Sequence, residues 1–193
     1  MVNRNSLIAL LVLLLIGCSS ASPSPTPAPV AEATLTLEPS PTPAPTAIPD
    51  FANKIRDAQY QLGNTEALHV VQLTDGKFEQ GAPAGADYIS VNVTDFMAAG
   101  DLNNDGQVEY AALIAENYGG SGVFVFLTVY AQVNGALTFQ TSVLVDDRPM
   151  LNALSIQNNE IYLDATTHAA ADPFCCPTLR TTRHYQLVAP NHL

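Results

Sequence analysis

Tryptophan is absent from this sequence, cysteine occurs three times, and lysine and arginine together number only seven. Against them stand eighteen Asp and Glu residues, so the formal net charge is −11. This balance argues against binding to nucleic acid and against adsorption to anionic lipid, because both need a basic surface. Apolar runs are short as well. The run from Leu7 to Ile16 has ten residues and would rise only about 15 Å as a helix, too little to cross a bilayer.

What that run does resemble is the apolar part of a signal peptide. Arg4 supplies a positive charge before it, and Leu15-Ile16-Gly17-Cys18 follows at its end. This tetrapeptide resembles the lipobox of bacterial lipoproteins. The resemblance implies cleavage before Cys18, acyl chains on Cys18, and an anchor in a membrane, since two or three chains hold a protein stably. An ordinary signal peptide with an incidental cysteine is the alternative.

Proline dominates the next segment. Residues 19–49 hold nine of the fourteen prolines, and the heptapeptide Pro-Ser-Pro-Thr-Pro-Ala-Pro occurs at 23–29 and again at 39–45. Such a composition favours an extended, disordered tether on the order of 100 Å long. A proline-rich recognition motif is the alternative, although no basic residue flanks the prolines to orient a binding groove. The expected organisation is therefore a signal peptide over 1–17, a lipidated linker over 18–50 and one globular domain over 51–193.

The globular part is expected to be mainly β. Short apolar runs alternate with turn sequences, which favours one antiparallel domain, a sandwich or an open barrel, with at most one or two short helices. Residues 55–62 suit either a short helix or a first strand. Val123 to Val133 is apolar on both faces and should be a central strand, and Asn134-Gly135 after it predicts a hairpin. The other expected strands are 68–73, 88–93, 108–115, 137–145, 154–156, 161–163 and 181–188, with turns at Thr74 to Lys77 and at Asn158-Asn159.

A loop of oxygen-bearing residues predicts a calcium site. Asp101, Asn103, Asp105 and Glu109 occupy positions 1, 3, 5 and 9, Gly106 permits a sharp turn, and the carbonyl of Gln107 falls at position 7. The EF-hand glutamate at position 12 is missing, because Ala112 stands there. The loop resembles the calcium loops of FG-GAP and integrin-type propeller repeats, from which it departs by ending in Glu and by occurring once. A metal-free turn rich in Asp and Asn is the alternative.

The two remaining cysteines are adjacent. With Cys18 lipidated and the chain exported, Cys175 and Cys176 have only each other as partners within the chain, and a structural vicinal disulfide is expected. Three alternatives remain: a thiol-exchange site, a soft-metal site with His168, Asp172 or His184, and pairing between molecules.

Several other polar groups invite functional interpretations. Gly119 to Gly122 lacks the residues of a phosphate loop or of a nucleophile elbow and is interpreted as a mobile hairpin. His69 is expected to be a core or edge residue. Asp146-Asp147-Arg148 is expected to form a surface ion pair. An acid–base site built from Asp164, His168 and Asp172 lacks a nucleophile placed beside it by the sequence.

Most of residues 60–190 resembles a group of uncharacterised exported bacterial proteins. The shared motifs are Gly100 to Gly106, Gly119 to Phe124, Asp147-Arg148, Asp172 to Thr178 and Thr182 to Leu187. The resemblance implies an intact domain and no particular activity.

Together these observations predict a lipid-anchored protein of the cell envelope, on the outer face of the cytoplasmic membrane or on the outer membrane. Its β domain is expected to be non-enzymatic, stabilised by calcium, and to bind an unknown envelope or extracellular partner. The alternative is an envelope hydrolase or thiol-redox enzyme that uses the region around His168 and Cys175-Cys176.

Overall fold

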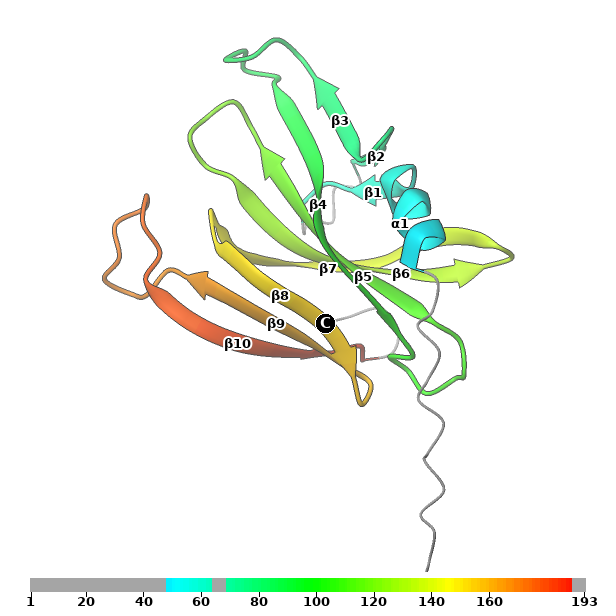
Figure 1. Ribbon diagram of the computed structural model, residues 1–193. Helices are drawn as coiled ribbons and strands as arrows, with labels where there is room; N and C mark the ends of the chain where they lie inside the picture. Colours follow the sequence, from blue (N-terminus) through cyan, green and yellow to red (C-terminus); the bar gives the residue numbers. More distant parts are fainter. Residues whose placement is uncertain (1–47, 64–68, 189–193) are drawn as a thin grey trace, which may run out of the picture. The chain divides into compact units, whose positions relative to one another are not determined.

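The computed structural model describes residues 48–63 and 69–188. The expected signal peptide, Cys18 and the proline-rich tether lie outside the described residues. One helix and ten strands form the described part (Figure 1): α1 (Ile48–Arg56), β1 (Gln59–Gln61), β2 (Val70–Gln72), β3 (Lys77–Gln80), β4 (Ile89–Gly100), β5 (Glu109–Asn117), β6 (Phe124–Val133), β7 (Ala136–Asp147), β8 (Met150–Gln157), β9 (Glu160–Thr167) and β10 (Leu179–Gln186). No helix among these residues is long and apolar enough to span a membrane.

The strands form three antiparallel sheets. A five-stranded sheet has the order β3-β4-β5-β6-β7, a three-stranded sheet has the order β10-β9-β8, and β1 pairs with β2. The prediction of a mainly β, antiparallel domain with one short helix is confirmed.

The five-stranded sheet buries apolar side chains on both faces. On one face, Ile114 and Tyr130 pack with Ile55 of α1 and Tyr60 of β1. On the other face, alternate residues of the same strands, such as Leu113, pack against the three-stranded sheet. This two-sided burial explains why β6 is apolar on both faces, and it confirms that β6 is central, between β5 and β7. The layers can be followed in Figure 1, with α1 and β1 on one side and β8 to β10 on the other.

Burial also decides the elements whose sequences were ambiguous. The alanines of β5 would suit a helix, yet Ala111 and Ala112 are both fully buried in the sheet, one on each face. The segment from residue 55 to residue 62 contains both candidate structures, because α1 ends at Arg56 and β1 begins at Gln59.

The turn sequences are confirmed, with one difference. Asn134-Gly135 and Asn158-Asn159 adopt the positive φ angles of tight hairpin turns and connect paired strands. At Thr74 to Lys77 the turn also forms, but the strands beside it join different sheets: β2 pairs with β1, and β3 pairs with β4. The sequence specified this turn locally, whereas the partners of its flanking strands were set by packing.

The two larger sheets approach closely at Gly100. A Cβ atom on this glycine would lie 2.4 Å from Cγ2 of Ile156 on β8. Any side chain at this position would therefore push β4 and β8 apart.

Candidate functional site

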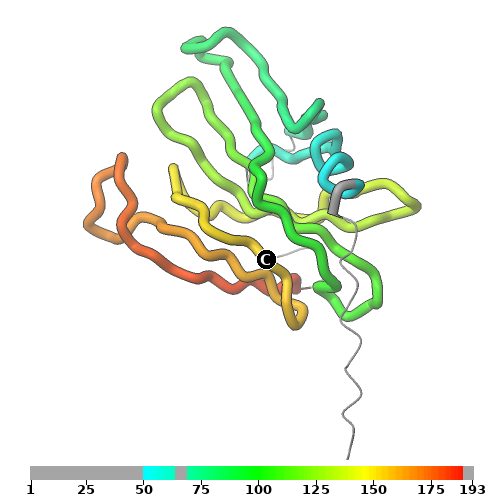
Figure 2. Tube along the Cα trace, viewed as in Figure 1, coloured from blue at the N-terminus to red at the C-terminus, as the bar shows by residue number. Residues whose placement is uncertain are grey.

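Three loops meet at one end of the domain. Antiparallel strands alternate in direction, so the β5–β6, β7–β8 and β9–β10 connections lie at the same end, as the trace in Figure 2 shows. Hydrogen bonds join the first two: the N–H of Val123 donates to Asp147 Oδ1 (2.8 Å), and the N–H of Arg148 donates to the carbonyl of Val123 (2.7 Å). The motifs at 119–124, 147–148 and 172–178, which are far apart in the sequence, are therefore brought together.

Arg148 connects the β7–β8 turn to the β9–β10 loop. Its guanidinium binds Asp147 in a bidentate manner, with Nη2 2.6 Å from Oδ2 and Nε 3.1 Å from Oδ1, and Nη2 also donates to the carbonyl oxygen of Phe174. Burial opposes ionisation of Asp147, but the hydrogen bonds from Arg148 and Val123 outweigh it and lower the pKa of this carboxyl group. The expected surface ion pair is thus partly buried and holds two loops together.

His168 is fixed through both ring nitrogens. Nδ1 lies 3.1 Å from Asp146 Oδ2, and Nε2 lies 3.2 Å from the carbonyl oxygen of Phe174. A neutral imidazole can donate to one of these acceptors and an imidazolium to both. Both nitrogens thus face oxygen acceptors, but a neutral ring donates to only one of them, and a substrate at Nε2 would have to displace the carbonyl of Phe174.

Asp172 closes the base of the β9–β10 loop. Its Oδ2 accepts hydrogen bonds from the N–H groups of Ala169 (2.8 Å) and Thr178 (2.7 Å), and its Oδ1 accepts one from the Thr178 hydroxyl (2.8 Å). The hydrogen bond from Ala169, together with those from Thr178, lowers the pKa of Asp172. This carboxylate acts as a clamp at the two ends of the loop.

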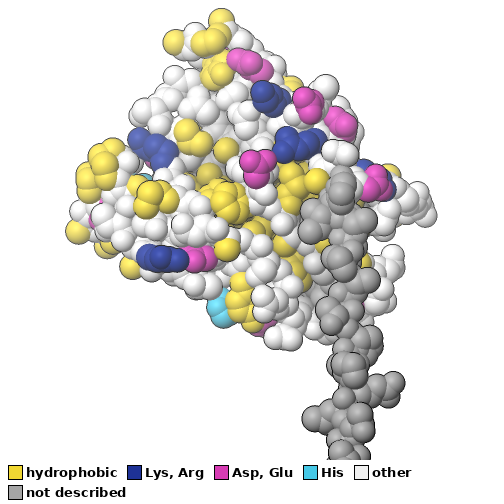
Figure 3. Space-filling view, in the orientation of Figure 1, with side chains coloured by type: hydrophobic (Ala, Val, Ile, Leu, Met, Phe, Trp, Pro, Cys, Tyr) yellow, Lys and Arg dark blue, Asp and Glu magenta, His cyan; other side chains and the backbone are white. Residues whose placement is uncertain are grey.

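A cavity of about 570 Å³ opens between these loops. It is lined by apolar residues and by the residues of the clamps: Phe124, Leu144, Ala169, Ala170, Phe174, Asp146, Asp147, Asp172 and His168. Phe174 is 88% exposed and Leu144 is 45% exposed, although both are large apolar side chains. Figure 3 shows apolar side chains at the surface on the side where Figure 1 places the β9–β10 loop. The polar groups of this pocket hold the loops, which leaves the apolar groups available to contact a ligand.

The cysteine pair lies at the tip of the same loop. Cys175 and Cys176 are both exposed, their sulfur atoms lie 2.31 Å apart, within disulfide-bonding distance, and the N–H of Cys176 donates to the carbonyl of Pro173 (3.0 Å). The pair directly follows Phe174, the residue whose carbonyl is bound by Arg148 and His168.

The described residues show no arrangement that matches the soft-metal site considered for the cysteine pair. Across residues 48–63 and 69–188 no three His, Cys, Asp or Glu residues are grouped as metal ligands would be. His184 packs its ring on Tyr162 at 4.3 Å and faces Glu160, whereas Asp164 pairs with Arg180 at 2.9 Å. His184 and Asp164 therefore pair with residues other than the cysteines, and His168 and Asp172 hold the β9–β10 loop.

The predicted calcium loop lies at the other end of β5, about 27 Å away at roughly 3.3 Å per residue. Asn104 and Gly106 adopt positive φ angles there, of 63° and 81°. Asp101 accepts hydrogen bonds from the N–H groups of Asn104 (2.7 Å) and Gly106 (3.0 Å), and Asp105 Oδ1 accepts one from the N–H of Gln107 (2.7 Å). Backbone donors within the loop thus stabilise its sharp turn.

Two carboxylates of this loop converge on an amide group. The side-chain nitrogen of Asn103 lies 3.1 Å from Asp105 Oδ2 and 3.4 Å from Glu109 Oε1. Glu109 is only 2% exposed, and its burial, together with the charges of Asp105 and Asp101, raises the pKa of its carboxyl group. The oxygen donors suit a hard cation such as Ca²⁺, but the loop's own N–H groups occupy several of them. Calcium binding remains a prediction.

A buried carboxyl group at the end of β5 was not among the residues singled out in the sequence. Glu116 is fully buried and accepts hydrogen bonds from the Tyr60 hydroxyl (2.6 Å), the N–H of Gly63 (2.8 Å) and the Tyr118 hydroxyl. Burial, and then the charge of Glu116, raises the pKa of Tyr60. One signal was available in the sequence: Glu116 follows Ala112 and Ile114 at the period of two that marks an inward face of a strand.

His69 is exposed just before β2, and its carbonyl accepts a hydrogen bond from the N–H of Leu62 (2.9 Å). It is therefore an edge residue.

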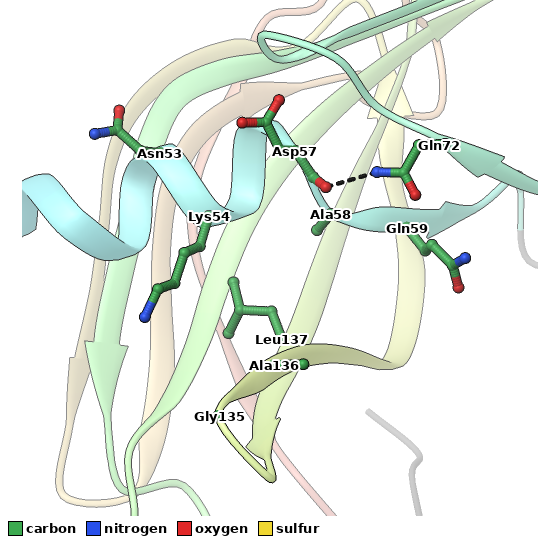
Figure 4. Close-up of a pocket in the computed structure, with 9 residues that line it drawn as sticks. All are labelled: Asn53, Lys54, Asp57, Ala58, Gln59, Gln72, Gly135, Ala136 and Leu137. Carbon is green, nitrogen blue, oxygen red and sulfur yellow. Dashed lines mark hydrogen bonds between the residues drawn. The ribbon is translucent and has the colours of Figure 1, made fainter.

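A second pocket, of about 460 Å³, lies between α1, the β1–β2 pair and the β6–β7 hairpin (Figure 4). Five of its nine lining residues are polar or charged, and the Gln72 amide donates to the carbonyl of Asp57 (2.6 Å) within it. Of the motifs singled out in the sequence, the Asn134-Gly135 turn contributes Gly135 to this pocket, whereas none of the candidate metal, cysteine or acid–base residues lines it.

Comparison of the chain with known protein families, curated proteins and solved structures gave no match, so the candidate site is interpreted from its own geometry.

Proposed function

We propose that the chain is a lipid-anchored, extracytoplasmic binding protein whose β domain takes an apolar, uncharged ligand in the pocket between its three loops. The anchor rests on the sequence from Leu15 to Cys18, and the proline-rich segment would carry the domain away from the membrane. Calcium at the Asp101 loop would stabilise the opposite end of the domain.

The pocket itself carries the proposal. A volume of about 570 Å³ falls within the range of small-molecule sites, roughly 300–1,000 Å³. Phe124, Leu144 and Phe174 provide apolar surface around it. Phe124 and Leu144 lie on the strands β6 and β7, and the loop that carries Phe174 is fixed by Arg148 and Asp172. A pocket fixed in advance binds with a smaller loss of conformational entropy.

Charges around the pocket favour an uncharged ligand. Asp146, Asp147 and Asp172 line it, but Asp147 is paired with Arg148 and Asp146 contacts His168. Behind them, Arg183 donates to the carbonyl of Val145 (2.7 Å) and to Thr167 Oγ1 (3.1 Å). The guanidinium groups of Arg148 and Arg183 thus offset most of the charge of the three carboxylates, so no strong field selects an ion.

A hydrolase is the second candidate, because His168 and Asp146 form a hydrogen-bonded pair that faces a pocket. However, His168 Nε2 is bound to the carbonyl of Phe174. The described residues that line the pocket include no Ser, Thr, Cys or Lys nucleophile. Its three carboxylates, of Asp146, Asp147 and Asp172, already bind His168, Arg148 and the N–H of Ala169. The geometry therefore supports binding better than covalent catalysis.

Titration with benzyl alcohol, an uncharged aromatic probe, tests the proposal. Amide NMR shifts should change at Ala169, Ala170 and Leu144, and the variant Leu144→Ser should bind roughly fivefold more weakly because apolar contact is lost. Val133→Ser is the matched control, since Val133 is 48% exposed, much like Leu144, but lies near the β6–β7 hairpin. Shifts that map elsewhere, or equal affinity in the Leu144 variant, would refute this site.

A further inference from the structure

We infer that the Cys175–Cys176 pair is a thiol–disulfide exchange site that a dithiol can reduce while the domain stays folded. Its redox state then controls the position of Phe174, which forms one wall of the pocket. The inference rests on the proposed function only for its effect on ligand binding. The exchange reaction itself does not depend on a ligand.

Accessibility is the first observation. Both cysteines are exposed, and so are Pro173 and Phe174 beside them. An attacking thiolate must reach a sulfur atom along the S–S axis, so a disulfide in a buried core is reduced only after unfolding, whereas an exposed one is open to direct attack. The pair belongs to the loop between β9 and β10 and contributes nothing to either of the two apolar clusters of the core.

The surroundings of the pair are the second observation. The carbonyl group of Phe174, one peptide unit before Cys175, is bound by the Arg148 guanidinium and lies 3.2 Å from His168 Nε2. Reactive cysteines typically occupy exposed positions next to Arg or His, where positive charge stabilises the thiolate that forms when a disulfide opens. Arg148 is the cationic group held next to the pair, with Asp147 as its counter-ion.

The base of the loop is fixed independently of the sulfur atoms. Asp172 binds the N–H groups of Ala169 and Thr178, so it joins the two ends of the segment that contains the cysteines. Opening the S–S bond would leave this clamp in place and release only residues 173–177. Reduction should therefore change the tip of the loop without unfolding the domain.

The chemistry balances with a dithiol as the reductant. A thiolate of the dithiol attacks one of the two cysteine sulfurs, the S–S bond breaks, and the other cysteine leaves as a thiolate that takes up a proton. The second thiol of the reductant then attacks its own sulfur in the mixed disulfide and releases the first cysteine. Two electrons and two protons pass to the protein, and the reductant leaves as its internal disulfide.

Phe174 couples this reaction to the pocket. Its side chain lines the cavity, its carbonyl is held by Arg148 and His168, and its next residue is Cys175. In the oxidised form the two-residue ring restricts the backbone directly after Phe174. When the ring opens, the restriction on the backbone at Cys175 and Cys176 is lost, and Phe174 is positioned only by the contacts of Arg148 and His168 with its carbonyl.

The experiment compares oxidised protein with protein treated with dithiothreitol under native conditions. Alkylation followed by mass spectrometry should find both Cys175 and Cys176 modified after reduction, while circular dichroism and the cooperative melting transition are retained. Benzyl alcohol should bind the reduced form at least roughly threefold more weakly, a change of about 0.65 kcal/mol. The double variant Cys175→Ser/Cys176→Ser should bind benzyl alcohol as weakly as the reduced form does, and dithiothreitol should not change its affinity.

Phe174→Ala is the control for coupling. This variant should be reduced as readily as the unaltered protein, but its affinity for benzyl alcohol should no longer depend on redox state. Reduction that requires denaturant would overturn the inference, and so would equal binding by the oxidised and reduced forms. If benzyl alcohol binds neither form, the proposed function fails. The inference is then decided by whether the amide shifts of Ala169 and Ala170 change on reduction of the folded protein.

Discussion

The hydroxyl groups of three tyrosines allow a sharp test of how the buried Glu116 contributes to stability. Tyr60 is fully buried and donates to Glu116 Oε1 at 2.6 Å, whereas Tyr118 donates to the same carboxyl group but is 47% exposed. Tyr130 is also fully buried, and within the described part of the chain its hydroxyl has no hydrogen-bond partner. Replacement of each by Phe removes one oxygen atom and retains the ring.

The expected changes in the free energy of unfolding differ. Tyr60→Phe removes a buried hydrogen bond to a carboxyl group and should destabilise the domain by about 1.5–3 kcal/mol. Tyr118→Phe should destabilise it by less than about 1 kcal/mol, because water can replace the lost donor. Tyr130→Phe should be neutral or stabilising, since it removes a polar atom that is buried without a partner.

Urea denaturation and thermal melting, followed by circular dichroism, would measure these differences. For a domain of this size, 1 kcal/mol corresponds to a shift in Tm of about 3–5 °C. Tyr60→Phe should therefore lower Tm by roughly 5–15 °C. The reasoning is refuted if Tyr130→Phe destabilises as much as Tyr60→Phe, because loss of the oxygen atom, and not of its hydrogen bond, would then explain the effect.

Four further predictions follow from other parts of the structure. Gly100→Ala should destabilise the domain by about 1–3 kcal/mol, because the new Cβ would overlap Ile156; an unchanged urea midpoint would contradict the close approach of β4 and β8. Because the folded-state pKa of Asp172 is lowered, its contribution to stability should be present above the unfolded value of about 3.9 and be lost as the pH falls through the lower folded value. The unfolding free energy of Asp172→Asn should accordingly vary less with pH in that range, and an identical pH dependence would argue against the clamp. Millimolar Ca²⁺ should stabilise the protein by roughly 1–3 kcal/mol but leave Asp105→Ala unchanged, with Asp95→Ala as the exposed control; no heat in calorimetry and no shift in Tm would remove the calcium site. Without a reductant, alkylation of the denatured protein should leave the peptide that contains Cys175 and Cys176 unmodified, and two free thiols there would exclude the disulfide.

Local signals in the sequence were sufficient for much of the fold. Residues 88–93 were predicted to form a strand, and β4 covers most of them, with Val91 and Val93 buried. Asn134-Gly135 predicted a hairpin because both residues tolerate positive φ angles, and both adopt them. These features depend only on neighbouring residues, so they could be predicted without knowledge of the fold.

The candidate site could be predicted only in pieces. Asp147-Arg148 and Asp172 to Thr178 stood out as motifs, but no spacing indicated that Arg148 would bind the carbonyl of Phe174, 26 positions away. Glu116 was missed because two of its three donors, Tyr60 of β1 and Gly63 in the turn after it, lie more than fifty residues earlier. Contacts of this kind follow from the order of strands in a sheet, which a single sequence does not encode locally.

The sequence by itself thus determined the acidic composition, the alternating apolar pattern that makes strands, and the turns. It also determined the lipobox-like segment and the proline-rich segment that follows it. The tertiary structure decided that the five-stranded sheet is covered on both faces, that β2 and β3 join different sheets across one turn, and that three distant loops enclose an apolar pocket. The physical reason is the range of the interactions. Turn conformation and strand alternation arise from backbone sterics and from neighbouring side chains. Burial, loop clamping and the position of Phe174 depend on surfaces that come into contact only when the sheets pack.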